Sequence, residues 1–337
     1  MKIIYARYLH IPQFLWVEAT VASCLRSLRR AVRSSLGGER FHLIQVHSTW
    51  PIGLAAPFLA REIGIPFVVT LHMEDDSRLC SRGGNSLLYR RMLEEASAVV
   101  SVGRPLERFL QKVHPDLCLL KSCIIPNGVD HDAVRVISSE NGGGTNGWGR
   151  LVSVGNLWPS KGMDLTLRAL SLLRKKGTPW LGLTVVGEGP ERKNLQKLAR
   201  ELGIDDRVQF KGRLPHEDTL REIARGDLFI LPSWREAFGV VYLEAMACGK
   251  PVIGCFGQGA EDIICHGIEG LLVAPGQVDD LAEAIARIME NRELALRMGV
   301  AGINRVREFT WERNAAQYLQ VYRRVLDEGG TAGGDKG

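Results

Sequence analysis

Long apolar runs are missing from this sequence of 337 residues. No uninterrupted apolar stretch approaches the ~20 residues that a helix needs to span a bilayer. The N-terminal stretch has an early lysine but also the acidic Glu18, and it lacks a small-residue cleavage site, so it is a poor signal peptide. We therefore expect a cytoplasmic protein.

The seven cysteines show no pairing pattern. None belongs to a C-x-x-C pair, and no cysteine–histidine cluster has the spacing of a zinc finger. An odd, scattered set of this kind is typical of buried free thiols in a reducing compartment. We expect no metal site built from sulfur.

Several nucleotide-binding and nucleic-acid-binding motifs are also missing. No predicted strand is followed by G-x-G-x-x-G, which disfavours a nicotinamide-dependent dehydrogenase. The phosphate-binding loop GxxxxGK[ST] does not occur. No motif combines aromatic with basic residues in the way that nucleic-acid-binding modules do. We expect no nucleic-acid partner.

The excess of positive charge is confined to the first part of the chain. Residues 1–135 hold 17 Lys and Arg against 12 Asp and Glu, which accounts for the whole formal net charge of +5, and residues 136–337 hold 26 of each. A one-sided basic surface suits an acidic partner such as anionic lipid. The excess is small, and solubility alone explains it equally well.

What is present is an alternation of short apolar runs with helical patterns, which predicts parallel, doubly wound α/β sheets. The chain length suits two domains of roughly 150 residues each. The only internal stretch of linker composition is SSENGGGTNGWG at 138–149. Ten segments are expected to form strands: 41–48, 66–72, 98–103, 123–128, 151–157, 181–189, 207–212, 227–233, 251–255 and 270–275.

The stretch SWREAFGVVYLEAMACGK, residues 233–250, places two glutamates around the predicted start of a helix. Glu236 lies in the strand-to-helix loop, and Glu244 follows in the early part of the helix. Gly239 lies where a backbone could approach a ligand, and the first helical N–H groups can hold a phosphate. Two carboxylates beside such a site can accept hydrogen bonds from vicinal sugar hydroxyls. Ordinary surface glutamates would give the same pattern.

A second glycine-flanked loop, VGNLWPSKGMD, follows the first strand of the second domain. Its Gly155, Asn156 and Lys161 lie at the carboxyl end of that strand, where open α/β sheets bind ligands. The lysine could neutralise a diphosphate. A solvated loop lysine is the alternative.

Together, these motifs closely resemble glycosyltransferase family 4, the retaining GT-B sugar transferases. The resemblance is carried by VGNLWPSKGMDLTLRAL, LTVVGEGPER, VQFKGRLPHEDTL, DLFILPSWREAFGVVYLEAMACGKPVIG, GQGAEDII and GIEGLLVAPGQVDDLAEAI, in this order. TLHMED, SAVVSVGRPLERFL and IIPNGVD extend it into the first domain, so that it covers roughly residues 40–326. It implies two Rossmann-like domains facing a central cleft.

The resemblance also implies a domain plan. We expect an N-terminal acceptor-side domain over 1–137, the linker over 138–149 and a nucleotide-sugar-binding domain over 150–309. A closing helix over 310–328 would cross back to the first domain, ahead of a disordered tail over 329–337. Nothing before FHLIQVHS resembles the family's opening glycine-rich turn, so we expect the first domain to be N-terminally shortened.

Residue roles carry over from the resemblance. Glu244 would hold the ribose hydroxyls, Glu236 would lie near the donor sugar, and Lys161 would neutralise the departing diphosphate. His72 would contact the donor sugar, unless it is a strand-end histidine bonded to backbone. The remaining donor-site residues are Gly155, Asn156, Gly212, Arg213, Phe238, Gly239, Val240 and Glu261.

The resemblance implies attack by an acceptor hydroxyl on the face that the leaving group vacates, with no metal and no cofactor. The acid clusters at 74–76 and 205–206 are expected to be surface or capping acids. Many relatives carry an arginine where this chain has Asn156, so one diphosphate cation is missing. Rival functions are a nucleotide-sugar epimerase, a glucan phosphorylase, for which no pyridoxal-binding lysine context occurs, and a non-catalytic sugar-nucleotide-binding remnant.

Two helical patterns flank these motifs. Over 21–36, Arg26, Arg29, Arg30 and Arg33 fall on one face and apolar residues mostly on the other. Such a helix could lie on the inner face of an anionic membrane, which would suit a lipid-linked acceptor, or pack on the protein. The last helix, from near Thr310, carries an apolar stripe that suits either a crossing helix or an ordinary core helix.

Overall fold

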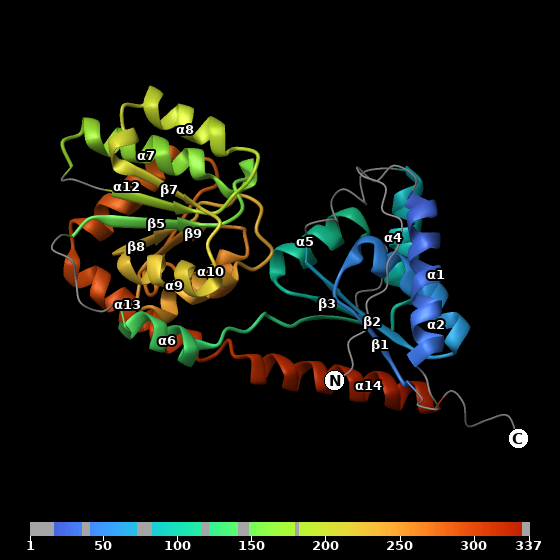
Figure 1. The fold of residues 1–337 in the computed structure, drawn as a ribbon. Helices are drawn as coiled ribbons and strands as arrows, with labels where there is room; N and C mark the ends of the chain where they lie inside the picture. The colour runs from blue at the N-terminus through green and yellow to red at the C-terminus, as the bar shows by residue number, and fades with distance from the viewer. Residues whose placement is uncertain are drawn as a thin grey trace, which may run out of the picture. The chain divides into compact units, whose positions relative to one another are not determined.

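The computed structural model describes residues 17–35, 41–72, 83–115, 121–140, 148–178 and 182–331. The described residues fall into two compact units. The first contains those within 1–126 and within 315–337, and the second those within 127–314 (Figure 1). The second unit is therefore inserted in the sequence of the first.

The first unit is built on a parallel sheet in the order β1-β2-β3-β4. Its strands are β1 (Ile44–Val46), β2 (Phe67–Leu71), β3 (Ala98–Ser101) and β4 (Ser122–Ile124). Its helical elements are α1 (Val17–Ser35), η2 (Thr49–Gly53), α2 (Leu54–Ile63), α4 (Gly83–Glu95), α5 (Arg104–Val113) and most of α14 (Trp311–Thr331).

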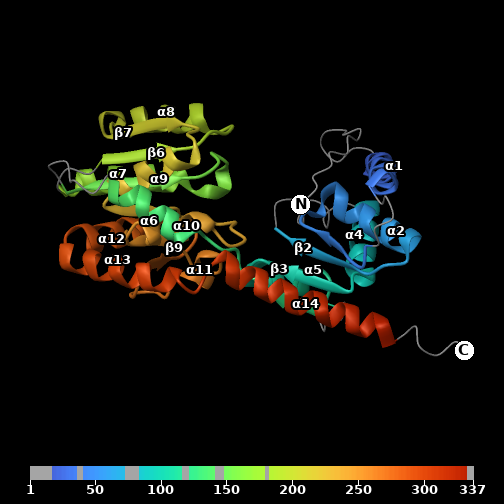
Figure 2. The same cartoon turned by 60° about the horizontal axis from the view of Figure 1, so that its bottom comes forward.

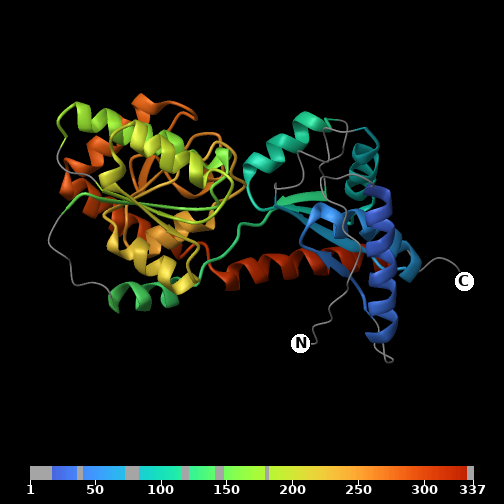
Figure 3. The ribbon, with the colours of Figure 1, turned by 45° about the horizontal axis from the view of Figure 1, so that its top comes forward.

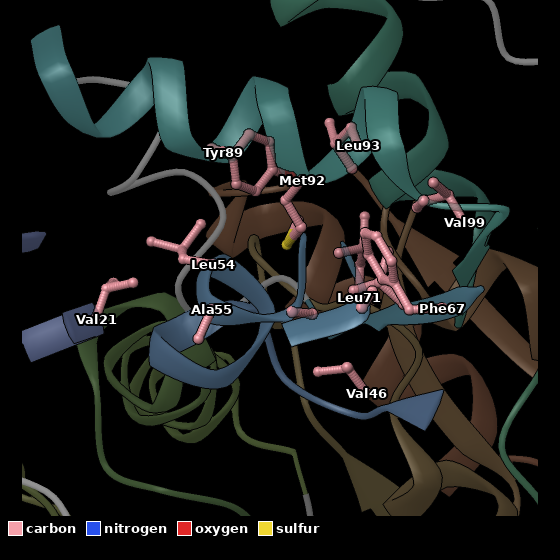
Figure 4. Packing of buried hydrophobic residues seen from close by; sticks show 14 of the residues in the cluster. Val21, Val46, Leu54, Ala55, Phe67, Leu71, Tyr89, Met92, Leu93 and Val99 are labelled. Atoms are coloured by element: carbon pink, nitrogen blue, oxygen red, sulfur yellow. The ribbon is translucent and has the colours of Figure 1, made fainter. Parts of the chain in front are cut away.

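Both faces of this sheet are covered. Successive side chains of β2 point to opposite faces, as they do in any strand. Phe67 and Leu71 pack with α1, α2, α4 and α5 in the larger cluster (Figure 4). Val68 packs instead in a second cluster, to which α14 contributes Tyr318, Val321 and Val325. Figure 2 shows α14 running along the first unit. The apolar face of α14 is thus part of the first unit's core.

The second unit holds a parallel six-stranded sheet in the order β10-β9-β8-β5-β6-β7. Its strands are β5 (Arg150–Val154), β6 (Gly182–Val186), β7 (Val208–Gly212), β8 (Leu228–Ile230), β9 (Val252–Cys255) and β10 (Gly270–Val273). The order reverses between β5 and β8, so the loops after these two strands diverge at a topological switch point, where doubly wound sheets bind ligands.

Helices cover both faces of the second sheet. Helices α7, α8 and α12 lie on one face, and α9, α10 and α13 on the other, where α6 packs on α9 and α10 (Figures 1 and 3). The bounds are α6 (His131–Glu140), η4 (Pro159–Lys161), α7 (Met163–Lys175), α8 (Arg192–Glu201), η5 (Asp205–Arg207), α9 (His216–Arg225), α10 (Val240–Ala247), α11 (Ala260–Ile263), α12 (Val278–Met289) and α13 (Arg292–Val306).

Each of the ten segments expected to be strands overlaps one, although β4 and β5 begin one residue earlier than expected, and the two parallel sheets match the expected fold class. The unit boundary differs from the expected one. It falls at 126/127 rather than 137/138, because α6 packs on helices of the second unit. The segment expected to be a linker from 138 begins inside α6, and α14 runs three residues into the expected disordered tail.

The helix over 17–35 packs on the protein. Val21 and Cys24 are buried in the larger cluster, and α1 contacts α2. The Arg29 guanidinium donates to the Glu62 carboxylate of α2 at 2.5 Å. Arg26 and Arg30 remain exposed on the outer face. No helix among the described residues combines the length and the apolar character needed to cross a membrane.

The described cysteines are all free, but they are not uniformly buried. Cys24 and Cys255 are buried, and burial raises their pKa values to about 11 and about 12. Cys265 is exposed, which differs from the expected buried set, because it lies in the loop that precedes β10. The expected surface role of Asp205 and Asp206 agrees with their exposure on the short helix η5.

Candidate functional site

The loops that follow β5 and β8 bring Lys161 and Glu236 together. The Lys161 ammonium donates to the Glu236 carboxylate at 2.7 Å, and only 21% and 12% of the two side chains are exposed. The residues are 75 positions apart in the chain, so the contact depends on the sheet order, in which β5 and β8 are neighbours. The two residues therefore lie at the carboxyl ends of adjacent strands.

A close approach of the two loops requires glycine at position 162. Gly162 has φ 67°, and a Cβ added there would lie 2.3 Å from the Pro232 carbonyl oxygen. Such a distance is far inside van der Waals contact, so a larger residue would push the loops apart. Gly162 thus fixes the distance between the segment carrying Lys161 and the one leading to Glu236.

Further hydrogen bonds hold Glu236 in place. The Ser160 carbonyl accepts from the Ser233 hydroxyl and from the Trp234 N–H, both at 3.0 Å. The Glu236 N–H donates to the Gln258 side-chain oxygen at 3.2 Å, and the Glu236 carbonyl accepts from Gly259 at 2.9 Å. Three loops of the unit therefore fix the backbone that carries this carboxylate.

Helix α10 begins directly beside this pair. Gly239 is its N-cap residue with φ 92°, and a Cβ there would lie 2.5 Å from the Tyr242 ring. The N–H groups of Val240 and Val241 open the helix, where the backbone dipole presents its positive end. Phe238 is buried, and its ring centroid lies 5.9 Å from that of Phe309. This contact anchors the loop between β8 and α10.

Glu244 lies one turn into α10 and contacts a residue that the sequence analysis did not single out. Its carboxylate is 2.8 Å from His216 Nε2, at the start of α9. Glu244 is mostly buried, whereas 68% of the His216 side chain is exposed. On the same helix, burial and then the charge of Glu236 raise the pKa of Tyr242 well above its ordinary value. Glu236 and Glu244 therefore flank the first turns of α10.

The glycine-rich loops after β5 and β6 lie against each other. The Gly155 N–H donates to the Val186 carbonyl at 3.0 Å, and the Leu157 N–H donates to the Glu188 carbonyl at 2.9 Å. Asn156, between them, is exposed. Gly212, at the end of β7, joins these loops, since its carbonyl accepts a hydrogen bond from the Gly187 N–H at 2.8 Å.

Two other expected residues, Arg213 and Glu261, lie in loops of the second unit. Arg213 is exposed in the loop between β7 and α9, three residues before His216. The Glu261 carboxylate accepts from the Gly257 N–H at 3.0 Å, which closes the loop that also holds Glu236 through Gln258 and Gly259. These contacts give Glu261 a role in loop shape.

His72 belongs to the first unit, at the carboxyl end of β2. Its ring centroid lies 6.1 Å from that of His47, which lies 5.6 Å from Tyr318. The Tyr318 hydroxyl and the Thr70 hydroxyl are 2.8 Å apart, and Gln45 donates to Thr70 at 3.0 Å. The carboxyl edge of the first sheet thus holds a polar cluster of its own.

Three contributors escaped the sequence analysis: His216, Gln258 and Ser160. The motif RLPHEDTL places His216 at the start of a helix that follows a strand, which is a signal for a site residue. Ser160 acts through its backbone carbonyl, for which residue type gives no signal, and Gln258 acts through its side-chain oxygen on a residue 22 positions away, which the sequence does not reveal. The described residues contain no group of three or more His, Cys, Asp or Glu side chains able to hold a metal ion.

Two family models match the chain. That of the Glycosyl transferases group 1 matches residues 147–305, and that of Glycosyltransferase Family 4 matches residues 5–133. The N-acetyl-alpha-D-glucosaminyl L-malate synthase of Bacillus anthracis is 30% identical over 295 residues, 86% of this chain and 76% of that protein.

Two further similarities concern nucleotide ligands. The GDP-mannose-dependent alpha-(1-6)-phosphatidylinositol monomannoside mannosyltransferase of Mycolicibacterium smegmatis is 28% identical over 87% of this chain and 77% of that protein. The solved structure of Anabaena Alr3699/HepE in complex with UDP superposes with a TM-score of 0.75 at 20% identity, covering 91% of this chain and 83% of that one. At 20% identity, this structural similarity shows the fold alone.

Proposed function

Since this chain belongs to the group 1 glycosyltransferases of family 4, we propose that it moves a hexose from a nucleoside-diphosphate sugar to a hydroxyl acceptor, with retention of the anomeric configuration. The observation that carries the proposal is the Lys161–Glu236 ion pair beside the N-terminus of α10, with Glu244 one turn further on. This arrangement combines a cation, helix N–H groups and two carboxylates within one unit.

The diphosphate would bind at Lys161 and the first N–H groups of α10. Negative charge develops on the leaving diphosphate as the glycosidic bond breaks, and a positioned cation stabilises that charge. Glu236 holds the Lys161 ammonium in position. Gly155 and Asn156 would line the same side, with Asn156 donating a hydrogen bond where many relatives have an arginine.

The ribose would bind at Glu244. Its carboxylate, which His216 contacts at 2.8 Å, would accept hydrogen bonds from the two vicinal hydroxyls. Arg213 and Gly212, in the loop that leads to His216, would border the nucleobase. Glu261 would support the sugar side through its loop.

The sugar would lie against Glu236 and the backbone around Phe238 and Gly239. The acceptor hydroxyl would attack the anomeric carbon on the face that the diphosphate leaves. The new bond forms to the acceptor oxygen, the bond to the phosphate oxygen breaks, and the hydroxyl proton passes to the leaving phosphate. This chemistry needs neither a metal ion nor a cofactor.

We assign the reaction to cell-surface polysaccharide or glycolipid assembly on the cytoplasmic side of a membrane. The basic outer face of α1, with Arg26 and Arg30 exposed, supports peripheral attachment to an anionic surface. The phosphatidylinositol-linked acceptor in the name of the mycobacterial relative agrees with a lipid-linked acceptor.

The test is a panel of nucleotide sugars, scored by thermal shift and by release of nucleoside diphosphate. We expect one donor to raise the melting temperature of the wild-type protein, and Glu244→Ala to lose that shift. Glu283→Ala, an exposed glutamate of α12, is the matched control and should keep it. Release of nucleoside diphosphate in the presence of an acceptor would support sugar transfer as well as donor binding.

Two results would contradict this proposal. A donor that binds but releases no diphosphate with any acceptor would favour a non-catalytic sugar-nucleotide-binding protein. A folded protein that no donor stabilises would refute the site itself.

A further inference from the structure

A groove of about 500 Å³ lies on the second unit, between α7, α8 and the loops that follow β5 and β8. Its volume falls within the ~300–1,000 Å³ typical of small-molecule sites. Met163 and Leu195 are buried at its apolar lining. None of the residues assigned above to the donor lines it.

Two tryptophans line this groove from different loops. Trp158 follows β5 and is 48% exposed, and Trp234 follows β8 and is 47% exposed. The Trp234 indole N–H donates to the Pro159 carbonyl at 3.2 Å, and its backbone N–H donates to Ser160. The indole of Trp234 is therefore held in a fixed orientation next to the loop that carries Trp158. A held, half-exposed indole offers a flat apolar surface with little entropy left to lose on binding.

Polar groups alternate with this apolar lining. Asp164 and Arg168 lie four residues apart on α7, and Glu191, Lys197 and Glu201 come from α8 and the residue before it. Carboxylates accept hydrogen bonds and the guanidinium and ammonium groups donate them. The groove thus offers both hydrogen-bonding roles along an apolar lining.

This composition disfavours several classes of ligand. Three carboxylates against two cations would repel an anion such as a phosphate. No metal-binding group of three or more acidic, His or Cys residues occurs in the described part of the chain. An apolar peptide helix would offer no polar partner to these five charged side chains, which include the Lys197–Glu201 pair at 3.4 Å, and would cost several kcal/mol for each fully buried ion.

We propose that this groove is a saccharide-binding site, separate from the donor site. A neutral sugar has apolar C–H faces that can stack on the indoles of Trp158 and Trp234, and hydroxyls that both donate to carboxylates and accept from Arg168. Its ligand is then an oligosaccharide of the acceptor or product. That identity rests on the proposed function, whereas saccharide binding itself does not.

The site adjoins the catalytic loops. Trp158 lies three residues before Lys161, and Trp234 lies two residues before Glu236. A glycan held here is retained beside the loops of the donor site between successive transfers. Occupancy therefore raises the local concentration of acceptor ends near the enzyme.

The experiment titrates the donor-free protein with maltotriose, cellotriose, α-1,6-mannotriose and triacetylchitotriose, followed by tryptophan fluorescence and calorimetry. We expect at least one trisaccharide to bind, and glycerol at equal hydroxyl concentration not to. Trp158→Ala should weaken binding by about tenfold, which corresponds to roughly 1.4 kcal/mol. Leu198→Arg, which fills the groove from α8, should abolish it.

Trp311→Ala is the matched control, because Trp311 is 49% exposed and lies outside the groove. It should leave trisaccharide affinity unchanged. The inference is overturned if no trisaccharide binds to folded wild-type protein, or if Trp158→Ala and Leu198→Arg both bind as wild type does.

Donor binding is measured on the same variants to separate the two proposals. Lys161→Ala should lose the thermal shift caused by the donor and keep trisaccharide binding. Leu198→Arg should keep that shift and lose trisaccharide binding. If trisaccharides bind but no donor does, the proposed function fails and the saccharide site stands. If donors bind and trisaccharides do not, the saccharide site alone fails.

Discussion

At the residue scale, Lys161 combines a paired charge with its proposed role at the diphosphate. Its ammonium is balanced by Glu236 at 2.7 Å. A bound diphosphate would offer it a stronger negative partner. The ion pair therefore keeps the ammonium in a partly buried position that would be costly for an unpaired cation.

Lys161→Ala should reduce the rate of donor cleavage by about 10²–10³-fold, the cost typical of removing one positioned electrostatic contact to the transition state. Steady-state release of nucleoside diphosphate measures it. Lys193→Ala, an exposed lysine of α8, should behave as wild type. A Lys161→Ala variant with wild-type turnover would show that this residue does not contact the leaving group.

Gly239 should tolerate no side chain. Gly239→Ala places a methyl group 2.5 Å from the Tyr242 ring at a φ of 92°, so we expect a loss of roughly 2–4 kcal/mol in the free energy of unfolding. Gly203→Ala is the control, since Gly203 also has a positive φ of 66° but open space around it. It should cost only about 1 kcal/mol. Urea unfolding distinguishes them, and equal losses would mean that the Tyr242 contact relaxes freely.

These residues also show what sequence reasoning could reach. Lys161 and Glu236 could be proposed from their loops, because a charged residue in a glycine-containing loop after a predicted strand is visible in the sequence. Their mutual contact could not, because it depends on β5 and β8 being neighbours in the sheet. The position of His216 at the start of a helix was visible in the sequence, but its contact with Glu244 was not, because Glu244 lies 28 positions away on another helix.

At the scale of elements, the two faces of α1 differ in role: one packs into the first unit, and the other exposes basic residues. Val21 and Cys24 pack into the first unit, which explains why the helix forms there. The exposed Arg26 and Arg30 are not needed for that packing. The sequence pattern alone could not decide between membrane and protein contact, because both need one apolar and one basic face.

The double variant Arg26→Glu/Arg30→Glu should lose binding to vesicles of phosphatidylglycerol, at about 1 kcal/mol for each basic residue removed, while melting as wild type does. Vesicle sedimentation measures this. Arg297→Glu on α13 is the control and should still sediment. Equal sedimentation of all three proteins would exclude α1 as the membrane contact.

Helix α14 makes the stability of the first unit sensitive to alkaline pH. Burial raises the pKa of Tyr318 to about 12, although the Thr70 hydrogen bond lowers it in part. A phenol with a raised folded-state pKa contributes stability that is complete below pH ~10 and is lost as the pH rises toward ~12. Melting temperatures should therefore fall between these values.

Tyr318→Phe is the matching variant. It should be less stable by about 1 kcal/mol near neutral pH, since the hydrogen bond to Thr70 is lost. Between pH 10 and 12 its melting temperature should fall less steeply than that of the wild type. Parallel curves for the two proteins would show that Tyr318 does not titrate in this range.

At the scale of the whole molecule, the division into units was the least predictable feature. The composition of residues 138–149 indicates a linker, yet the boundary lies at 126/127. Composition marks where a chain lacks order, whereas a boundary depends on which unit a helix packs against. The strands were predictable because each is a short apolar run between turn residues.

The return of the chain to the first unit can be tested by one buried position of α14. Val325→Asp places an unpaired charge in the cluster with Val68 and Val100, and should cost roughly 2–4 kcal/mol. Differential scanning calorimetry should show one transition at lower temperature, while the donor-dependent shift of the second unit persists. Leu326→Asp, at an exposed neighbour, should melt as wild type does. Equal melting of both variants would contradict the packing of α14 on the sheet.

The interrupted sequence of the first unit also fixes an order of events on the ribosome. Val68, Val100 and Ile125 are synthesised early, but their partners Tyr318, Val321 and Val325 leave the exit tunnel only after the whole second unit has been made. One face of the first sheet is therefore bare while the second unit is translated, and it is this unit, begun first, that a nascent-chain chaperone would have to protect longest.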